Sequence, residues 1–135
     1  MVNRFSVPNL DECTIHLSKV ASNKVEPDLI LGNANILSTY TDRIILNKEV
    51  WISKGRIACI KESGSAKKIF NINDIKYYDV KKNILAPGLI DPHMHIESSM
   101  MTGCAYSEAA LLNGTTTIFC DSHEIGNVCD IEGIE

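Results

Sequence analysis

Two histidines spaced two residues apart carry the clearest chemical signal in the sequence. His93 and His95 end an apolar run, Leu89 to His95, that is predicted to be a strand. Side chains two apart on a strand point to the same face, about 6.5 to 7 Å apart along the backbone, so both imidazoles can converge on one cation. Asp91 and Glu97 share that face if the strand stays extended. Imidazoles bind Zn, Mn or Fe at about 2.0 to 2.2 Å, so the pair indicates a metal site, although histidines at a strand end can also be satisfied by ordinary hydrogen bonds.

A second polar cluster follows the next predicted strand, Thr115 to Cys120. Asp121, His123 and Glu124 lie just beyond it. The carboxyl ends of adjacent parallel strands meet at one edge of a sheet, where α/β folds build active sites, so these side chains are expected near the imidazole pair. The alternative is the start of a helix capped by Asp121 or Ser122, and the two interpretations are compatible.

The elements around both clusters predict parallel βα units. Tyr106 to Leu112 has helical character and is closed by Asn113-Gly114 before the second strand begins. Strands that alternate with helices favour a parallel sheet. Residues Val128 to Glu135 are typical of the opening of another helix.

The residues before these units predict a helix and a small antiparallel β unit. Asn9 and Glu12 form a capping pair ahead of a helix that runs to Ala21. From residue 28 onward, short β-rich runs are separated by turn signals at Gly32-Asn33, Asn47-Lys48 and Lys54-Gly55.

A polar loop at residues 64–68 and further extended structure at 77–80 and 84–86 complete this part of the chain. The pattern changes near Pro87-Gly88. We therefore predict two segments, residues 1–85 and 86–135.

The composition is that of a globular protein and excludes several classes of partner. The chain has 135 residues, with 13 basic and 17 acidic side chains and a net charge of -4. It has no basic patch for a nucleic acid, no apolar run near the about 18 to 20 residues that cross a bilayer, and no signal-peptide core in its first residues. We expect a cytoplasmic protein without a nucleic-acid or membrane partner. Five widely spaced cysteines without a Cys-x-x-Cys motif predict reduced, mostly buried thiols.

Other catalytic motifs are absent. The sequence has no Gly-x-Gly-x-x-Gly, P-loop, His-Glu-x-x-His or Gly-x-Ser-x-Gly. His95-Ile96-Glu97 matches half of the zinc nucleobase deaminase motif, but the Pro-Cys-x-x-Cys half is missing, which excludes that family.

The string Ala86 to His95, APGLIDPHMH, resembles the first barrel strand of the amidohydrolase superfamily. Its extension HIESSM at 95–100, with NGTTT at 113–117 and DSHEIGN at 121–127, is similar to the adenine deaminase family. The preceding helix and β unit also resemble the N-terminal segment of that family. Gly103 and Ser122 stand where that family usually has proline.

The resemblance implies an α/β protein with a small N-terminal β-sandwich-type unit and a short helix, followed by the first βα units of a metal-dependent (β/α)8 barrel. It implies hydrolysis of adenine to hypoxanthine in purine salvage, with a purine as the small-molecule substrate and a homo-oligomer as one option. His93 and His95 would be the first-strand ligands of a divalent metal, Mn or Fe, with Zn as a third option. Residues that would contact substrate or support the metal are Glu97, Ser98, Asp121, His123 and Glu124. The remaining catalytic residues of the family come from later strands, so those of this chain stay unassigned.

The length conflicts with a complete barrel. A (β/α)8 barrel needs about 250 residues, and this chain holds about two of its eight strands. We therefore expect a fragment that is inactive by itself. The His-x-His pair would serve another amidohydrolase that opens a cyclic amide equally well, and a non-catalytic truncated remnant is a further alternative.

Overall fold

The computed structural model describes residues 7–133 and divides the chain into two compact units, Met1–Ala86 and Pro87–Glu135. The architecture is mixed α/β. Among the described residues, no helix has the length and apolar character needed to span a membrane.

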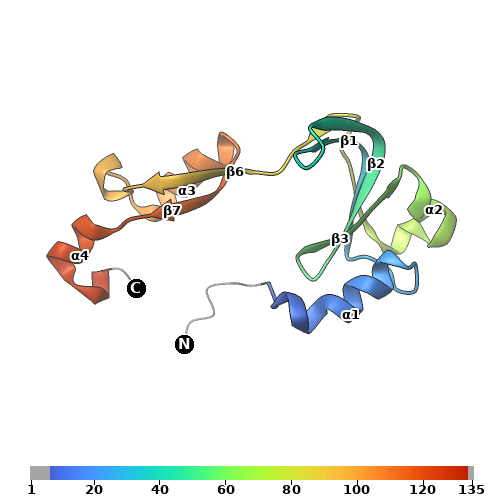
Figure 1. Ribbon diagram of the computed structural model, residues 1–135, viewed down its shortest axis with the longest axis horizontal. Helices are drawn as coiled ribbons and strands as arrows, with labels where there is room; N and C mark the ends of the chain where they lie inside the picture. Colours follow the sequence, from blue (N-terminus) through green and yellow to red (C-terminus); the bar gives the residue numbers. More distant parts are fainter. Residues whose placement is uncertain (1–6, 134–135) are drawn as a thin grey trace. The chain divides into compact units, whose positions relative to one another are not determined.

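The first unit is a sheet with two helices (Figure 1). In chain order its elements are α1 (Leu10–Ala21), β1 (Leu29–Ser38), β2 (Arg43–Ser53), β3 (Arg56–Glu62), α2 (Ser65–Ile69), a 3-10 turn (Ile72–Asp74), β4 (Lys76–Asp79) and β5 (Ile84–Leu85). The strand order is β3-β2-β1-β4, and β5 also pairs with β1.

The sheet is only partly the predicted antiparallel unit. β1, β2 and β3 pair antiparallel, as predicted, but β4 and β5 run parallel to β1. The predicted turn at Lys54-Gly55 is confirmed, since both residues have positive φ (54° and 70°) in the tight connection of β2 to β3.

The other two predicted turns are wrong. β1 continues through Gly32-Asn33 and β2 continues through Asn47-Lys48, each with a local shift in pairing register. Asn33 and Asn47 adopt positive φ (52° and 54°), a conformation that asparagine tolerates. The backbone N–H of Asn47 donates to the side-chain oxygen of Asn35 at 3.2 Å, so pairing between the strands absorbs the irregularity instead of ending the strand.

The two helices of the first unit differ from the prediction, one in its cap and the other in its presence. α1 is confirmed, but Asn9 does not cap its backbone: its Nδ2 donates to Oε1 of Glu12 at 3.1 Å. The predicted loop at 64–68 is largely helix α2, which begins beside the buried carboxylate of Glu49.

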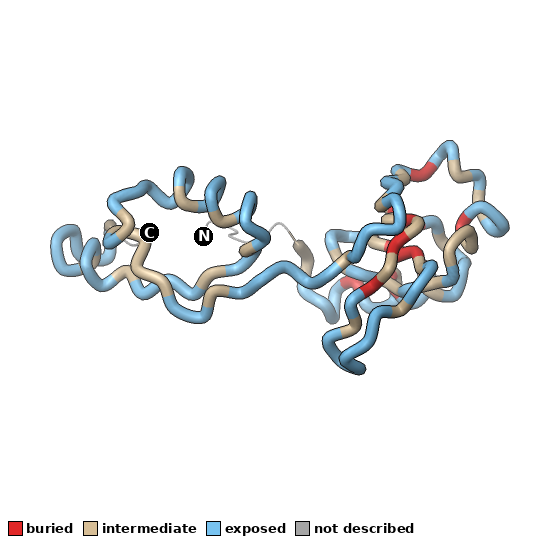
Figure 2. Tube along the Cα trace, turned by 90° about the horizontal axis from the view of Figure 1, so that it is seen from above, coloured by how far each residue is buried: buried red, intermediate tan, exposed pale blue. Residues whose placement is uncertain are grey.

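The core of the first unit lies on both faces of the sheet. Trp51 and Val50 are neighbours on β2, so they point to opposite faces, and each joins a separate buried cluster. The cluster with Trp51 contains Val20 of α1 and Ala66 of α2, which places both helices over that face. Figure 2 shows in red that the buried positions belong to the first unit.

The carboxylate of Asp79, at the end of β4, makes the first unit sensitive to acid. The backbone N–H of Lys81 (2.8 Å) and the amide of Asn33 (3.0 Å) donate to it and hold its pKa below the ordinary value. A lowered pKa stabilises the fold above the ordinary carboxyl pKa of about 4, and this stabilisation is lost as pH falls through the folded-state value.

We therefore expect Asp79→Asn to lower the urea concentration at the unfolding midpoint at pH 7, and we expect this effect to fade as the pH falls below the ordinary carboxyl pKa of about 4. Urea unfolding followed by the fluorescence of Trp51, the single tryptophan, measures this. The control is Asp42→Asn, in the exposed turn between β1 and β2. An effect of Asp79→Asn that does not change with pH contradicts the prediction.

The second unit is a parallel βα unit. Its elements are β6 (Leu89–Met94), a 3-10 turn (Glu97–Ser99), α3 (Gly103–Leu112), β7 (Thr115–Cys120), α4 (His123–Cys129) and a 3-10 turn (Ile131–Gly133). The predicted parallel pairing of the two strands is confirmed.

Both helices of the second unit begin earlier than predicted. α3 starts at Gly103 because the Thr102 hydroxyl accepts from the N–H of Ala105 at 3.3 Å, a cap that hydrophobic periodicity did not reveal. The helix predicted over Val128 to Glu135 is largely wrong: α4 spans His123–Cys129, a 3-10 turn follows at Ile131–Gly133, and residues 134 and 135 lie outside the described residues.

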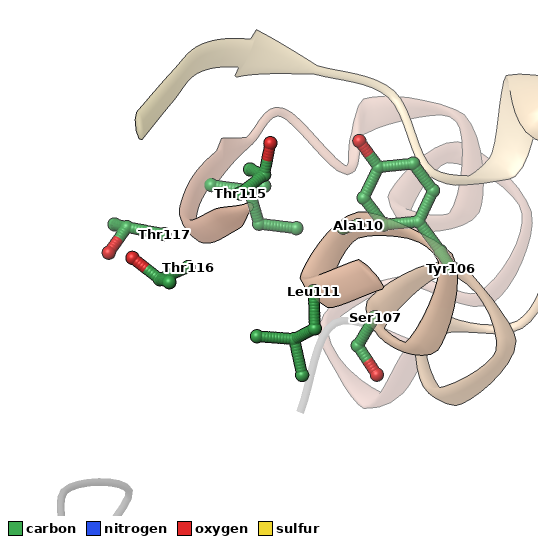
Figure 3. Close-up of a pocket in the computed structure, with 8 residues that line it drawn as sticks. Tyr106, Ser107, Ala110, Leu111, Thr115, Thr116 and Thr117 are labelled. Atoms are coloured by element: carbon green, nitrogen blue, oxygen red, sulfur yellow. The ribbon is translucent and has the colours of Figure 1, made fainter. Parts of the chain in front are cut away.

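The second unit has no buried residue among positions 87–133 (Figure 2). Helix α3 covers β7 loosely, leaving a gap of about 140 Å³ lined by Tyr106, Ala110 and Leu111 of the helix and by residues 115–118 of the strand (Figure 3). Large apolar side chains such as Phe119 and Leu112 remain exposed. The five cysteines are free, as predicted, but Cys104, Cys120 and Cys129 are exposed rather than buried because this unit has no core.

Hydrogen exchange should separate the two units. Amides of β6 and β7 are expected to exchange at least about 100-fold faster than those of the central strands β1 and β2, because local opening costs little where few apolar groups are buried. Mass spectrometry of peptides from the intact chain measures the difference. Equal protection of β2 and β7 would contradict the expectation.

Candidate metal centre

Two imidazoles lie at the carboxyl end of β6. The strand ends at Met94, so His93 is its penultimate residue and His95 follows it directly. Their Nε2 atoms are 2.9 Å apart, and the two rings meet edge to face with centroids 4.6 Å apart. The spacing of two residues thus brings both nitrogens to one point.

The end of β7 adds a carboxylate to this pair. Asp121 follows the strand, and one ligand atom each from His93, His95 and Asp121 lie within 4.8 Å of one another. The cluster forms because β6 and β7 are adjacent and parallel, so that their carboxyl ends meet.

A backbone hydrogen bond determines the protonation pattern of His95. Its Nδ1 lies 2.8 Å from the carbonyl oxygen of Asp121. A carbonyl oxygen can only accept, so Nδ1–H donates, and in the neutral ring Nε2 presents its lone pair. Such a bond to a carbonyl orients the histidine ligands of metal sites.

His123 stands at the edge of the cluster. Its ring centroid is 4.8 Å from that of His95, and its Nδ1 is 3.5 Å from a carboxylate oxygen of Asp121. The residue is therefore close enough to orient Asp121 without belonging to the three converging donors.

Glu97, Ser98 and Glu124 connect the segment after β6 to helix α4. The hydroxyl of Ser98 donates to Oε1 of Glu124 at 2.9 Å, and the backbone N–H of Ile125 donates to Oε1 of Glu97 at 3.3 Å. These residues hold the two strand ends together instead of adding to the donor set.

The side chains predicted to cap helix α4, those of Asp121 and Ser122, do not cap it. Ser122 occupies the N-cap position of α4, yet it makes no side-chain cap, and its hydroxyl lies 3.1 Å from Sγ of Cys120. Asp121 does not cap the helix either. Glu97 takes that role from a distant segment by accepting from Ile125.

Glu97 also departs from the strand face on which an extended chain would place it. The backbone turns into a 3-10 turn at Glu97–Ser99, three residues after β6 ends. Asp91 remains on the strand, where its Oδ1 accepts from the backbone N–H of His93 at 3.1 Å.

The carboxylate of Glu97 is favoured in its charged form. Its own backbone N–H is the main cause that lowers its pKa; burial opposes this, and the N–H of Ile125 and the imidazoles of His95 and His123 add to the lowering. Its second oxygen, Oε2, is nonetheless buried without a hydrogen-bond partner among the described residues.

Residues after β6 and at the start of α3 and α4 line a pocket of about 490 Å³. Glu97 lines it, as do both positions that depart from the resembled family, Gly103 and Ser122. Sequence reasoning missed the other lining residues, Ile96, Met101, Thr102, Ile125 and Gly133. No local pattern marks them, because the pocket forms only when α3 and α4 come together.

The donor set fits a transition metal. Two nitrogens that bind one cation at about 2.1 Å can lie at most about 4.2 Å apart, and the imidazole nitrogens meet this condition. Imidazole with carboxylate suits Mn, Fe and Zn. Three donors leave further coordination positions open, which water or a substrate can fill.

The site combines imidazole and carboxylate donors at the carboxyl ends of adjacent parallel strands. Metal sites of this class are found in α/β hydrolytic enzymes. No family model matches the chain. Among solved structures, the fold is similar to molinate hydrolase, with a TM-score of 0.55, 18% identity and coverage of 70% of this chain and 24% of that one.

Curated proteins with similar sequences are named adenine deaminases. The chain is 57% identical over 134 residues to the adenine deaminase of Chelativorans sp. (strain BNC1) and 58% identical over 134 residues to adenine deaminase 3 of Rhizobium johnstonii. Each alignment covers 99% of this chain and 22% of the relative. The resemblance to adenine deaminases is confirmed, and the chain spans about a fifth of the length of the relatives that it matches.

Proposed function

We propose that this chain supplies the first metal ligands and part of the substrate pocket of an adenine deaminase, which converts adenine and water to hypoxanthine and ammonia. The observation that carries the proposal is the convergence of His93, His95 and Asp121 at one sheet edge, in a chain whose curated relatives are named for this reaction.

A bound divalent metal, Mn or Fe with Zn as a third option, would lower the pKa of a water molecule to about 7 and so provide a nucleophile at neutral pH. His93 and His95 would hold this metal. The Asp121 carbonyl keeps His95 oriented for it, and the bonds of Glu97 and Ser98 to α4 keep the two strand ends in register.

The finer architecture is part of the same proposal. The exposed apolar surface of the second unit supports an arrangement in which further βα units complete a (β/α)8 barrel. The buried cluster on the second face of the first sheet supports a sandwich-type domain over residues 1–85. As part of this proposal, the full-length protein is a cytoplasmic enzyme of purine salvage, with a homo-oligomer as one option.

The test is ammonia release from adenine by the full-length protein that carries this segment, loaded with Mn or Fe, together with the ultraviolet change to hypoxanthine. The described chain alone should show no turnover above a His93→Ala/His95→Ala control, because three donors leave a metal underligated. A full-length protein that is inert on adenine but opens hydantoin, dihydroorotate or imidazolone rings would replace the assignment by a cyclic-amide hydrolase.

A further inference from the structure

The outward face of α1 carries an exposed apolar side chain between two opposite charges. The residues of this helix that are buried in the core are Cys13, Leu17 and Val20. On the opposite side, Asp11, Ile15 and Lys19 follow one another at intervals of four residues, which places them in one row along the helix. All three are exposed, Ile15 to 74%. The row is therefore acidic at one end, apolar in the middle and basic at the other end.

The hydroxyl groups beside this row are already hydrogen-bonded to the helix itself. The hydroxyl of Thr14 donates to the carbonyl of Leu10 at 2.6 Å, and that of Ser18 donates to the carbonyl of Thr14 at 2.9 Å. At the end of the helix, the hydroxyl of Ser22 donates to the carbonyl of Lys19 at 3.2 Å. A polar group that keeps its hydrogen bond costs little to remove from water. Another protein surface can therefore cover this face without leaving these hydroxyls unpaired.

A second copy of α1 is the partner whose charges fit the row. Asp11 and Lys19 lie on either side of Ile15, each about 6 Å from it along the helix axis at 1.5 Å per residue. Two copies of the helix can pack antiparallel about a two-fold axis at Ile15. That symmetry sets Asp11 of each copy opposite Lys19 of the other and brings the two Ile15 side chains together. A two-fold interface requires this kind of self-complementary surface.

We propose that the outward face of α1 pairs with the same face of a second copy of this protein, with Ile15 at the two-fold axis and two Asp11–Lys19 ion pairs beside it. The ion pairs fix the antiparallel orientation, and the apolar contact excludes water at the centre. One helix from each copy buries less than the roughly 1,600 Å² of a standard interface, so we expect a weak dimer with a Kd of about 10 to 100 μM. The inference concerns the first unit and is independent of the metal centre and of the proposed activity.

A cross-link without a spacer tests the pairing directly. A carbodiimide joins a carboxylate to an amine that it contacts, and Asp11 and Lys19 of one helix are about 12 Å apart along its axis, too far to be joined. An amide between these two residues therefore connects two copies. We expect mass spectrometry to find it in the full-length protein, cross-linked at concentrations above the expected Kd. Its absence overturns the proposal.

Charge reversal tests whether the ion pairs hold the dimer. Asp11→Lys and Lys19→Asp each turn two attractive pairs into two repulsive ones, so sedimentation equilibrium should show a Kd raised about 10- to 100-fold for either variant alone. An equimolar mixture of the two variants should regain the wild-type Kd. In that mixed dimer the introduced lysine faces the introduced aspartate, and the remaining Asp11 faces the remaining Lys19.

The matched control is Lys24→Asp. It makes the same change in charge as Lys19→Asp at an exposed position beyond the end of α1, so it should keep the wild-type Kd. A mixture that associates no better than each variant alone overturns the proposal, and so does a dimer that neither reversal weakens. Either result leaves the proposed deamination standing, because ammonia release from adenine measures that activity separately.

Discussion

Replacing His93 and His95 together with alanine should remove transition-metal binding from this chain. The two Nε2 atoms, 2.9 Å apart, are the closest pair of donors in the cluster, and Asp121 alone cannot hold a cation against water. Loss of an orienting partner of a metal ligand typically costs 10- to 100-fold in affinity. Loss of both ligands should therefore cost at least about 100-fold.

Metal analysis after equilibrium dialysis against Mn, Fe or Zn measures this loss. His16→Ala is the control, because that imidazole lies on α1, bonds to the hydroxyl of Ser53 and takes no part in the cluster. Stoichiometric metal in the double variant would move the site to the second cluster, Asp121, His123 and Glu124. His123 Nδ1 lies 3.5 Å from a carboxylate oxygen of Asp121, so these two residues could bind one cation together.

Replacing Glu49 should unfold or severely destabilise the first unit. Glu49 is fully buried in β2. Its Oε1 accepts from Nε1 of Trp51 (2.8 Å) and from the N–H of Ala66 (2.7 Å), while Oε2 accepts from the N–H of Gly64 (2.9 Å). Glu49→Ala would leave two buried donors, on Trp51 and Ala66, and the part-buried N–H of Gly64 without this acceptor. Each buried donor left unpaired costs about 1 to 3 kcal/mol, so we expect a loss of at least about 2 kcal/mol.

Two further variants make this result interpretable. Glu49→Gln keeps the volume but sets an amide donor against a backbone N–H, so it should destabilise almost as much if hydrogen bonding, not packing, is responsible. Glu62→Ala removes an exposed carboxylate that pairs with Lys48 on the neighbouring strand and should cost less than about 1 kcal/mol. Urea unfolding monitored by Trp51 fluorescence compares the three. A loss below about 1 kcal/mol for Glu49→Ala would contradict the assigned role.

The features that depend on near neighbours were predictable from the sequence. The period of two placed His93 and His95 on one face, the helical period defined α1, and Lys54-Gly55 specified a tight turn. Each of these results from backbone sterics and side-chain alternation within a few residues, so no distant contact was needed to establish them.

Only the tertiary structure decided the features that depend on residues far apart. Glu49 accepts from Ala66, 17 positions away, so the predicted loop becomes α2. Strand pairing carries β1 through Asn33, because ladder hydrogen bonds on both sides outweigh a local preference for a turn.

The candidate site follows the same division. Its two imidazoles belong to a local pattern, but the carbonyl that orients His95 lies 26 positions away, and the N–H that Glu97 accepts lies 28 positions away. The sequence therefore determined which donors stand at the strand end. The parallel pairing of β6 with β7 decided which groups orient them, because only that pairing brings the two strand ends together.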